Sequence, residues 1–524
     1  MLRPTFLGFE TAKRGLTAAQ KGLDIAGQNL TNWDSAGYTR QRITQVALAP
    51  DSYRSRYATS KVGLAGQGVE ITGIDQTRDV FLDKRFREEN GDLGYYGQAY
   101  TVLADIQASI NEFNPDTDVG LRSCLLSLNE ALQDFASNAY SETHANIVMT
   151  EFKNLTQTLQ QISSKLQNSR EQQIYDLEIS VGDVNKKLQQ IAGLNQAIME
   201  DMAATQGNSY FGPNELLDQR NLLLDELSQY MDLQYENNAD GAVTVTVNGQ
   251  TVVSGSQYDK MELMENPETG VVDLRWVSSN ETVNLTTGAL KASVDYTNGR
   301  GPNLKNPGES TVKGFLYYQD KLNTFAQTLA DTVNNIIPEV DENGEIKTDP
   351  ATGEIVYRKL LGAYTVADDG SGHVVFDQPI TADNLSISDE WSKDPSYIIF
   401  EKTQNGDADN KGKYALALSQ TLIDGTHGFD SNGEVFQGTF LDYVKGYVST
   451  LAEDVSFAEN RHTATSTVSN SLQDSRDQVW GVVVDEEVAN VMLYQKSLSA
   501  ASRLMTAMDE ALDVLINKTG LVGR

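Results

Sequence analysis

Two narrow apolar stripes, one near each end of the chain, constrain its fold more than any other feature. The N-terminal stripe alternates large and small residues at steps of three and four: Phe9, Ala12, Leu16, Ala19, Leu23, Ala26 and Leu30. This heptad pattern is typical of a helix that packs along a partner helix, and each alanine lets the partner approach closely. Thr31, Asn32 and Asp34 supply turn-forming side chains before Gly37, so we expect the helix to end near Leu30.

The C-terminal stripe follows the same pattern. Its members are Val484, Val491, Tyr494, Leu498, Ala501, Met505, Met508, Leu512 and Leu515. Only Glu487 interrupts the alternation. A single helix from Val484 to Ile516 would extend about 50 Å, and Lys518 and Gly520 would end it. The two stripes predict that the ends of the chain pair with each other, whereas the alternative is two ordinary amphipathic helices on a globular core.

A third stripe predicts a long helix from about His144 to Glu200. Its apolar residues are Leu155, Leu159, Ile162, Leu166, Ile174, Leu177, Val181, Val184, Leu188, Ile191 and Ile198. The eight-residue step from Leu166 to Ile174 indicates a stutter in the repeat, and a helix of this length is typical of rods and bundles. Further helical patterns cover residues 214–231, 312–337 (ended by Pro338) and 440–477.

Strand patterns fall between the helices. Val243, Val245 and Val247 alternate with threonine, and Asn248-Gly249 predicts a tight hairpin turn into residues 251–253. From residue 339 to about 412, Asp, Asn, Gly and Thr dominate, and short runs at 354–357 and 373–376 break this composition. We expect a small β-rich insert there.

These patterns together predict a mainly α fold with β-rich parts. The chain is expected to be elongated and multi-domain, with paired N- and C-terminal coiled-coil helices, a helical middle domain and an inserted β-rich outer domain. Residues 1–60 with 480–524 form the terminal-helix domain in this division. Residues 61–337 with 413–479 form the middle domain with its β-hairpins, and residues 338–412 form the outer domain. Both termini then lie at one end of the molecule.

The charge and the cysteine content exclude several classes of protein. A net charge of −32 argues against binding to nucleic acid or to an anionic membrane surface, since both need clustered Lys and Arg. No stretch approaches the roughly 18 apolar residues of a membrane span. Arg3, Glu10 and Lys13 interrupt any signal-peptide core, so we expect no cleavable signal peptide. Cys124 is the only cysteine and lies in an apolar run, which favours a buried hydrophobic role over a nucleophile.

Catalytic and metal-binding patterns are weak throughout the sequence. His144, His373, His427 and His462 are scattered without metal-ligand spacing. The segment 406–413 (GDADNKGK) has the wrong spacing for a phosphate-binding loop and indicates a turn. Acidic turns at Asp341 and Asp424 lack the pattern of a calcium-binding loop. We therefore expect no enzyme activity, no cofactor and no bound metal.

Three sequence segments carry a resemblance to a known family. Residues 15–32, which close with Gly37-Tyr-Thr-Arg-Gln, resemble the N-terminal helix and turn of the flagellar rod, hook and hook-associated proteins. The GYTRQ pentapeptide is similar to that of the hook-associated branch at the hook–filament junction. Residues 216–228 resemble the internal "LLDQRD" helix of that branch, and residues 481–490, followed by Tyr494-Gln495, resemble its C-terminal signature. The resemblance spans nearly the whole chain except roughly 338–412.

The resemblance implies a structural protein of the bacterial flagellum that connects hook to filament. Its paired terminal helices would form the inner tube, as a ring of subunits exported through the flagellar channel and located outside the cell. The implied partners are the hook protein, the next hook-associated junction protein, other copies of itself, and a cytoplasmic export chaperone at the C-terminal helix. Another axial protein of the rod and hook family, or an adhesin-like surface protein on the same scaffold, is the alternative.

The resemblance also implies which residues form the assembly interface. On the N-terminal side they are Leu16, Leu23, Asn29, Leu30, Asn32, Gly37 and Tyr38. On the C-terminal side they are Val488, Val491, Tyr494, Leu498, Met505, Leu512 and Leu515.

Overall fold

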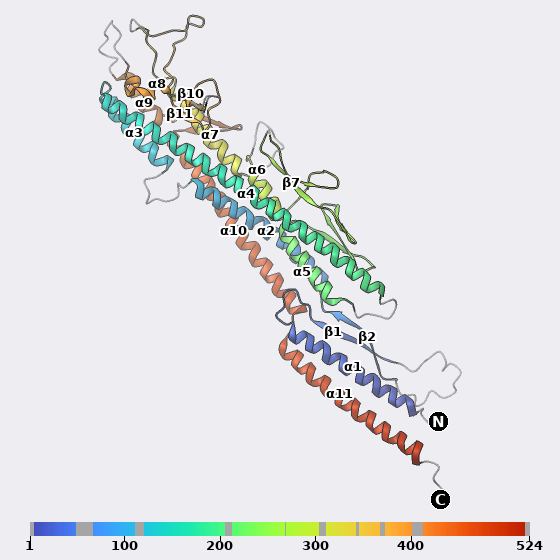
Figure 1. Cartoon of the computed structure of the whole chain (residues 1–524). Helices are drawn as coiled ribbons and strands as arrows, with labels where there is room; N and C mark the ends of the chain where they lie inside the picture. Colours follow the sequence, from blue (N-terminus) through green and yellow to red (C-terminus); the bar gives the residue numbers. More distant parts are fainter. Residues whose placement is uncertain are drawn as a thin grey trace.

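The molecule is elongated, and its two termini lie together at one end (Figure 1). The computed structural model describes residues 5–48, 67–110, 120–204, 212–267, 269–302, 311–341, 345–366, 372–400 and 412–518. The mainly helical, elongated architecture with small antiparallel sheets confirms the predicted fold class.

The terminal end is formed by a helix pair and a hairpin. Helix α1 (Thr5–Thr31) lies side by side with α11 (Val484–Asp513), and a π-helical turn, η4 (Val514–Lys518), continues α11 (Figure 1). Strands β1 (Gln41–Ala47) and β2 (Val69–Gln76) pair antiparallel and pack on α1. The predicted pairing of the chain ends and the predicted end of the first helix are confirmed.

Three long helices form the rod that extends from the terminal pair. They are α2 (Val80–Ile110), α4 (Glu142–Ala204) and α10 (Phe440–Trp480). With 63 residues, α4 would span roughly 95 Å, and it contributes to two separate hydrophobic cores. The shorter helices packed along the rod are α3 (Leu121–Ser137), α5 (Asn214–Tyr230), α6 (Ala289–Asn298), α7 (Phe315–Val333) and α9 (Lys413–Ile423).

One core lies against the C-terminal half of α4, nearer the terminal pair. It covers α4 residues from Leu177 to Ala192, α5, and two small sheets. Their strands are β3 (Gln234–Asn237), β4 (Val243–Val247), β5 (Gln250–Ser254), β6 (Gln257–Tyr258), β7 (Met261–Glu265) and β8 (Val272–Trp276). Asn248 and Gly249 both have positive φ, of 45° and 85°, and thus form the predicted hairpin turn.

The other core lies against the N-terminal half of α4, far from the termini. It joins α2, α3, α7, α9 and α10 with a hairpin of β12 (His427–Ser431) and β13 (Glu434–Gly438). The same core also receives β9 (Leu361–Val366), β11 (Leu385–Ile387), α8 (Asp389–Lys393) and a 3₁₀ turn, η2 (Pro395–Ile398). Strand β10 (Gly372–Val375) pairs with β9 at the edge.

The segment predicted as a β-rich insert therefore has two parts. Residues 338–357 pair through isolated bridges such as Thr348 with Ile355. Residues 360–361 and 382–398 instead contribute side chains to the core of the rod. The ring of Trp391 lies 5.2 Å from that of Phe152 of α4, and Trp391 is fully buried. The division of the chain into three domains stays a prediction.

The helix predicted over 312–337 is α7, and it is shorter than expected. It begins after Gly314 and ends at Val333, so the predicted end at Pro338 is wrong. The reason lies in Asn334, whose side-chain oxygen accepts the backbone N–H groups of Leu360 and Leu361 at 2.7 and 2.9 Å. This contact holds residues 360–361 against the C-terminal end of α7. The helix therefore ends at Val333, five residues before Pro338.

Candidate assembly interface

The seam between α1 and α11 is built on glycine. Gly8, Gly15 and Gly22 recur every seven residues on α1 and face, in turn, Met508, Ala501 and Tyr494 of α11. Residue numbers that rise on one helix and fall on the other show that the pair is antiparallel. A Cβ on Gly22 would overlap the Tyr494 ring, so the absence of a side chain allows the close approach.

The alanines of the N-terminal stripe lie in the same seam, as the sequence predicts. Ala12, Ala19 and Ala26 are buried with exposed fractions of 2–3%. The larger predicted residues flank this seam and are half-buried: Leu16, Leu23, Leu30, Val491, Tyr494, Leu498, Met505 and Leu512. Val488 and Leu515, at the two ends of the C-terminal set, are exposed at 43% and 48%.

A second stripe on α11 points away from α1. It also alternates steps of four and three, and all its members are exposed: Leu493, Ser497, Ala500, Leu504, Ala507, Ala511 and Val514. Leu493 and Leu504 are 59% and 46% exposed. A heptad stripe of leucine, alanine and valine with one serine, on an exposed helix face, is typical of a surface that packs on another helix.

The turn after α1 is fastened by Asn29. Its side-chain oxygen accepts hydrogen bonds from the Tyr38 hydroxyl at 2.8 Å and from the Gln41 N–H at 3.0 Å. Its amide nitrogen donates to the Gln41 carbonyl at 2.9 Å, so all three bonds close one loop. Gly37 adopts a φ of 77° in this turn and lies against Leu222 of α5, which explains the need for glycine.

Asn32 and Tyr38 complete the predicted turn residues. Asn32 is half-buried and donates to the carbonyl of Gln28 at 3.0 Å, which closes the last turn of α1. Burial raises the pKa of the Tyr38 hydroxyl well above its usual range, and the charges of Asp218, Glu215 and Glu487 raise it further. Tyr38 is therefore a neutral hydrogen-bond donor.

The chain ends are also held by an ion pair between Arg40 and the start of α11. The Arg40 guanidinium contacts Glu487 at 2.6 Å and Glu486 at 2.9 Å, and its backbone N–H donates to the Trp480 carbonyl. The Glu487 side chain is 3% exposed, whereas that of Glu486 is 59% exposed. The residue that interrupts the C-terminal stripe is thus a buried, paired carboxylate.

Asp218 of α5 ties the same turn to the rod. Its carboxylate accepts the Thr39 N–H at 3.1 Å and the Gln76 side-chain amide at 2.8 Å. Burial raises the pKa of this carboxyl to about 6, against the lowering effect of the Thr39 hydrogen bonds and the Arg78 charge.

A chain of alternating charges continues from there into the rod. Asp83 accepts from Arg78 at 2.6 Å and from Arg476 at 3.0 Å. Asp225 accepts from Arg476 at 2.5 Å and from Arg87 at 2.6 Å. We call this charged network, together with Asn29, Arg40, Asp218 and Glu487, the joint cluster. Each of these buried charges has a partner of opposite sign, and the pairs connect the terminal end to the rod.

Trp480 caps the joint cluster. The guanidinium groups of Arg78 and Arg476 lie 4.2 and 4.5 Å from its ring centre. These stacked contacts join the end of α10 to the start of α2.

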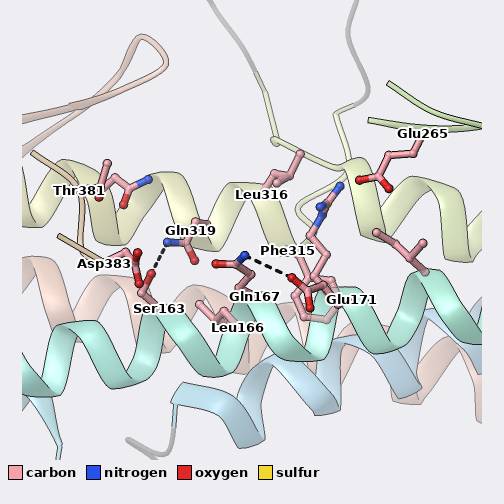
Figure 2. A pocket seen from close by; sticks show the side chains of 13 residues that line it. Ser163, Leu166, Gln167, Glu171, Glu265, Phe315, Leu316, Gln319, Thr381 and Asp383 are labelled. Atoms are coloured by element: carbon pink, nitrogen blue, oxygen red, sulfur yellow. Dashed lines mark hydrogen bonds between the residues drawn. The ribbon is translucent and has the colours of Figure 1, made fainter. Parts of the chain in front are cut away.

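A cleft of about 550 Å³ lies between α4 and α7, away from the terminal end (Figure 2). Gln319 donates to the Ser163 hydroxyl at 2.7 Å, and Gln167 donates to Glu171 at 3.2 Å. Neither histidine nor cysteine lines this cleft. The lining therefore lacks both the cysteine nucleophile and the histidine base that many covalent catalytic sites use.

The described part of the chain also lacks other features of a chemical site. No cluster of His, Cys, Asp or Glu there could hold a metal ion, and the four histidines lie on four different elements. Within the same ranges, no helix has both the length and the apolar character of a membrane span. The segment 406–411, part of the predicted turn, lies outside the described residues.

Comparison with known proteins gives one consistent family. Residues 107–349 match the domain described as "Flagellar hook-associated protein FlgK helical domain". The chain is 29% identical to flagellar hook-associated protein 1 of Bacillus subtilis over 99% of both chains. It is 23% identical to the protein of the same name from Escherichia coli, over 97% of this chain and 98% of that one.

The chain is thus similar to flagellar hook-associated protein 1 along nearly its whole length. A solved structure, that of the flagellar hook junction protein FlgK from Burkholderia pseudomallei, shares the fold. The TM-score is 0.54 at 15% identity, over 76% of this chain and 100% of that one. The resemblance stated from the sequence motifs is thereby confirmed.

The three family motifs meet at the joint cluster. GYTRQ supplies Tyr38 and Arg40, the LLDQR helix supplies Asp218, and the C-terminal signature supplies Glu487. Sequence reasoning predicted Asn29, Gly37 and Tyr38 as interface residues but missed the seam glycines, Arg40, Asp218 and Glu487. The seven-residue spacing of Gly8, Gly15 and Gly22 is visible in the sequence and indicates that these glycines share one face of the helix.

Proposed function

We propose that this chain is a structural subunit of the bacterial flagellum that joins hook to filament through polymerisation of its terminal helices. Its full-length relatives are named hook-associated protein 1, and a protein of the same fold is titled a flagellar hook junction protein. The observation that carries the proposal is the second, outward stripe of α11. Leu493 and Leu504 belong to neither core of the rod and do not face α1, so they are available to another subunit.

The partners follow from this role. The hook protein and the next hook-associated protein contact the two ends of a ring of these subunits, and neighbouring copies contact each other through α1 and α11. The predicted interface residues have two roles, one within the subunit and one between subunits. Leu16, Leu23 and Leu498 hold the helix pair together, and Val488 and Leu515 are exposed for contact with other subunits.

Export and location are part of the same proposal. The subunit leaves the cell through the flagellar channel without a cleavable signal peptide and functions outside the cell. A cytoplasmic chaperone covers α11 before export, because exposed leucines such as Leu493 would otherwise promote aggregation. A structural role of this kind requires no catalysis.

The outward stripe gives a direct test. The double variant Leu493→Asp with Leu504→Asp places two carboxylates on the face proposed to pack against other subunits. Each buried, unpaired charge would make the free energy of assembly less favourable by several kcal/mol. Both positions are exposed in the single chain, so the monomer should fold as before. We expect cells with hooks but no filaments, and flagellin released into the medium, by electron microscopy and immunoblotting.

The matched control is Ser499→Asp with Thr506→Asp. It adds the same two charges to exposed positions of the same helix outside the stripe, and full filaments are expected. Circular dichroism of both purified variants checks that helix content is unchanged. Normal filaments on cells that carry the Leu493 and Leu504 variant would overturn the assignment of this face.

A further inference from the structure

The seam between α1 and α11 does not by itself specify which residues face each other. Its glycines recur every seven residues, and each faces a different side chain: methionine, alanine or tyrosine. Glycine has no side chain with which to select a partner. A shift of α11 by one heptad, about 10.5 Å, would place Met508 opposite Gly15, and apolar groups would still fill the seam.

Two polar residues break this degeneracy. Asn29 follows Gly22 by seven residues, and Glu487 precedes Tyr494 by seven, so they occupy the next position of each repeat. Both are buried, with exposed fractions of 1% and 2%. Their partners are adjacent in the sequence, at the end of the turn after α1 and the start of β1: Arg40 bonds Glu487, and Gln41 bonds Asn29.

A shifted pair would lose these contacts. If Met508 faced Gly15, Tyr494 would stand beside Asn29, and the first two turns of α11 would have to leave the helix. Arg40 would then lose both Glu487 and Glu486. Removing a partner from a buried charge is strongly unfavourable, whereas the glycine seam would lose little.

We propose that Arg40 and Glu487, together with Asn29, set the register of the terminal helix pair. A single buried polar residue in a coiled-coil seam sets register in the same manner, at some cost in stability. The competing explanation is the short connection from Gly481 to Val483, which could fix the position of α11 without any polar contact. The inference concerns the isolated chain and does not depend on the proposed function.

Disulfide formation measures the register. A Cβ on Gly15 would lie 3.8 Å from that of Ala501, which is about the mean separation of ~3.8 Å in disulfides. In a chain with Cys124→Ser, the pair Gly15→Cys with Ala501→Cys reports the observed register. The pair Gly15→Cys with Met508→Cys reports the register shifted by one heptad. Both are oxidised in the purified full-length chain, and the intramolecular bond is identified by mass spectrometry.

In the parent chain, the 15–501 disulfide should form readily and the 15–508 disulfide rarely. Glu487→Gln should raise the fraction of the 15–508 disulfide at least about five-fold, which corresponds to roughly 1 kcal/mol. Arg40→Leu with Glu487→Leu should raise this fraction as well, because it also removes the contact. This double variant leaves no buried charge without a partner, so the effect cannot come from an unpaired charge. The matched control Glu486→Gln, at the exposed neighbour that also contacts Arg40, should leave the ratio unchanged.

Three results would overturn the proposal. A parent chain that forms both disulfides equally has no fixed register. Variants that still form only the 15–501 disulfide would assign the register to the connection at Gly481–Val483. Loss of both disulfides in both variants would show that the contact holds the helices together and does not select their register.

Discussion

The joint cluster shows how single polar side chains can orient a whole element. Asn29 makes three hydrogen bonds in a turn where no apolar residue could bond the backbone. Arg40, Asp218 and Glu487 then connect that turn to α11 and to the rod. Hydrogen bonds and ion pairs of these groups depend on direction. Together they therefore fix the orientation of the terminal helix pair relative to the rod, which apolar packing alone would define less well.

Asp218 makes this joint sensitive to pH. Its pKa in the folded chain is raised to about 6 from an ordinary value of 3.8, so the folded state binds a proton more tightly than the unfolded state. The contribution of Asp218 to stability therefore grows as the pH falls from 7 to 4, by up to about 3 kcal/mol. Asp218→Asn cannot titrate and should lack this contribution.

Urea unfolding of the parent and of Asp218→Asn, at several pH values between 4 and 7, tests the effect. The difference in the free energy of unfolding, parent minus variant, should rise as the pH is lowered through 6. A difference that stays constant or falls over this range would contradict the burial of an ionisable Asp218.

Sequence reasoning reached only part of this cluster. Tyr38 and Gly37 could be predicted because the GYTRQ motif is local. The pairing of Arg40 with Glu487 spans 447 residues, and that of Thr39 with Asp218 spans 179. A single sequence contains no signal that links charges so far apart, so Glu487 was visible only as an interruption of a stripe.

At the scale of elements, the close packing of α1 and α11 depends on the absence of side chains. Gly22 is buried against Tyr494, whereas Gly27 of the same helix has open space where a Cβ would be. Alanine improves helix propensity at both positions but meets a neighbouring side chain only at position 22. Substituting each glycine with alanine therefore distinguishes the effect of helix propensity from that of packing.

Gly27→Ala should stabilise α1 by about 0.5–1 kcal/mol through propensity alone. Gly22→Ala gains the same propensity but pushes α11 away, and overpacking typically costs about 1–3 kcal/mol. Hydrogen exchange of the α1 and α11 amides in the full-length chain should be slower in Gly27→Ala and faster in Gly22→Ala. Equal protection in the two variants would contradict the glycine seam.

Glycines also explain why the sequence pattern does not predict helix α2. Helix α2 contains Gly91, Gly94 and Gly97 within a weak apolar pattern, which is typical of turns. In the structure Gly94 lies against the backbone of Gln229, where a Cβ would overlap the Gln229 carbonyl. Close helix packing and turns use the same residue, so the pattern alone could not distinguish them, whereas the long regular stripe of α4 was predictable.

At the scale of the whole molecule, the terminal end and the rod are separate packing units. Both hydrophobic cores belong to the rod, and α4 extends through both of them. The terminal pair has its own seam, and the joint cluster connects it to the rod. This separation suits a subunit whose terminal helices polymerise while its rod remains folded.

A junction subunit is required between hook and filament, so cells that lack it should not extend a filament. The most direct measurement is electron microscopy of hook–basal bodies from a strain in which only this gene is deleted, with the full-length chain restored in a second strain. We expect hooks of normal shape without filaments in the deletion strain, flagellin in the medium, and full filaments after restoration. Filaments of normal length and attachment in the deletion strain would show that this chain is not the subunit that joins hook to filament.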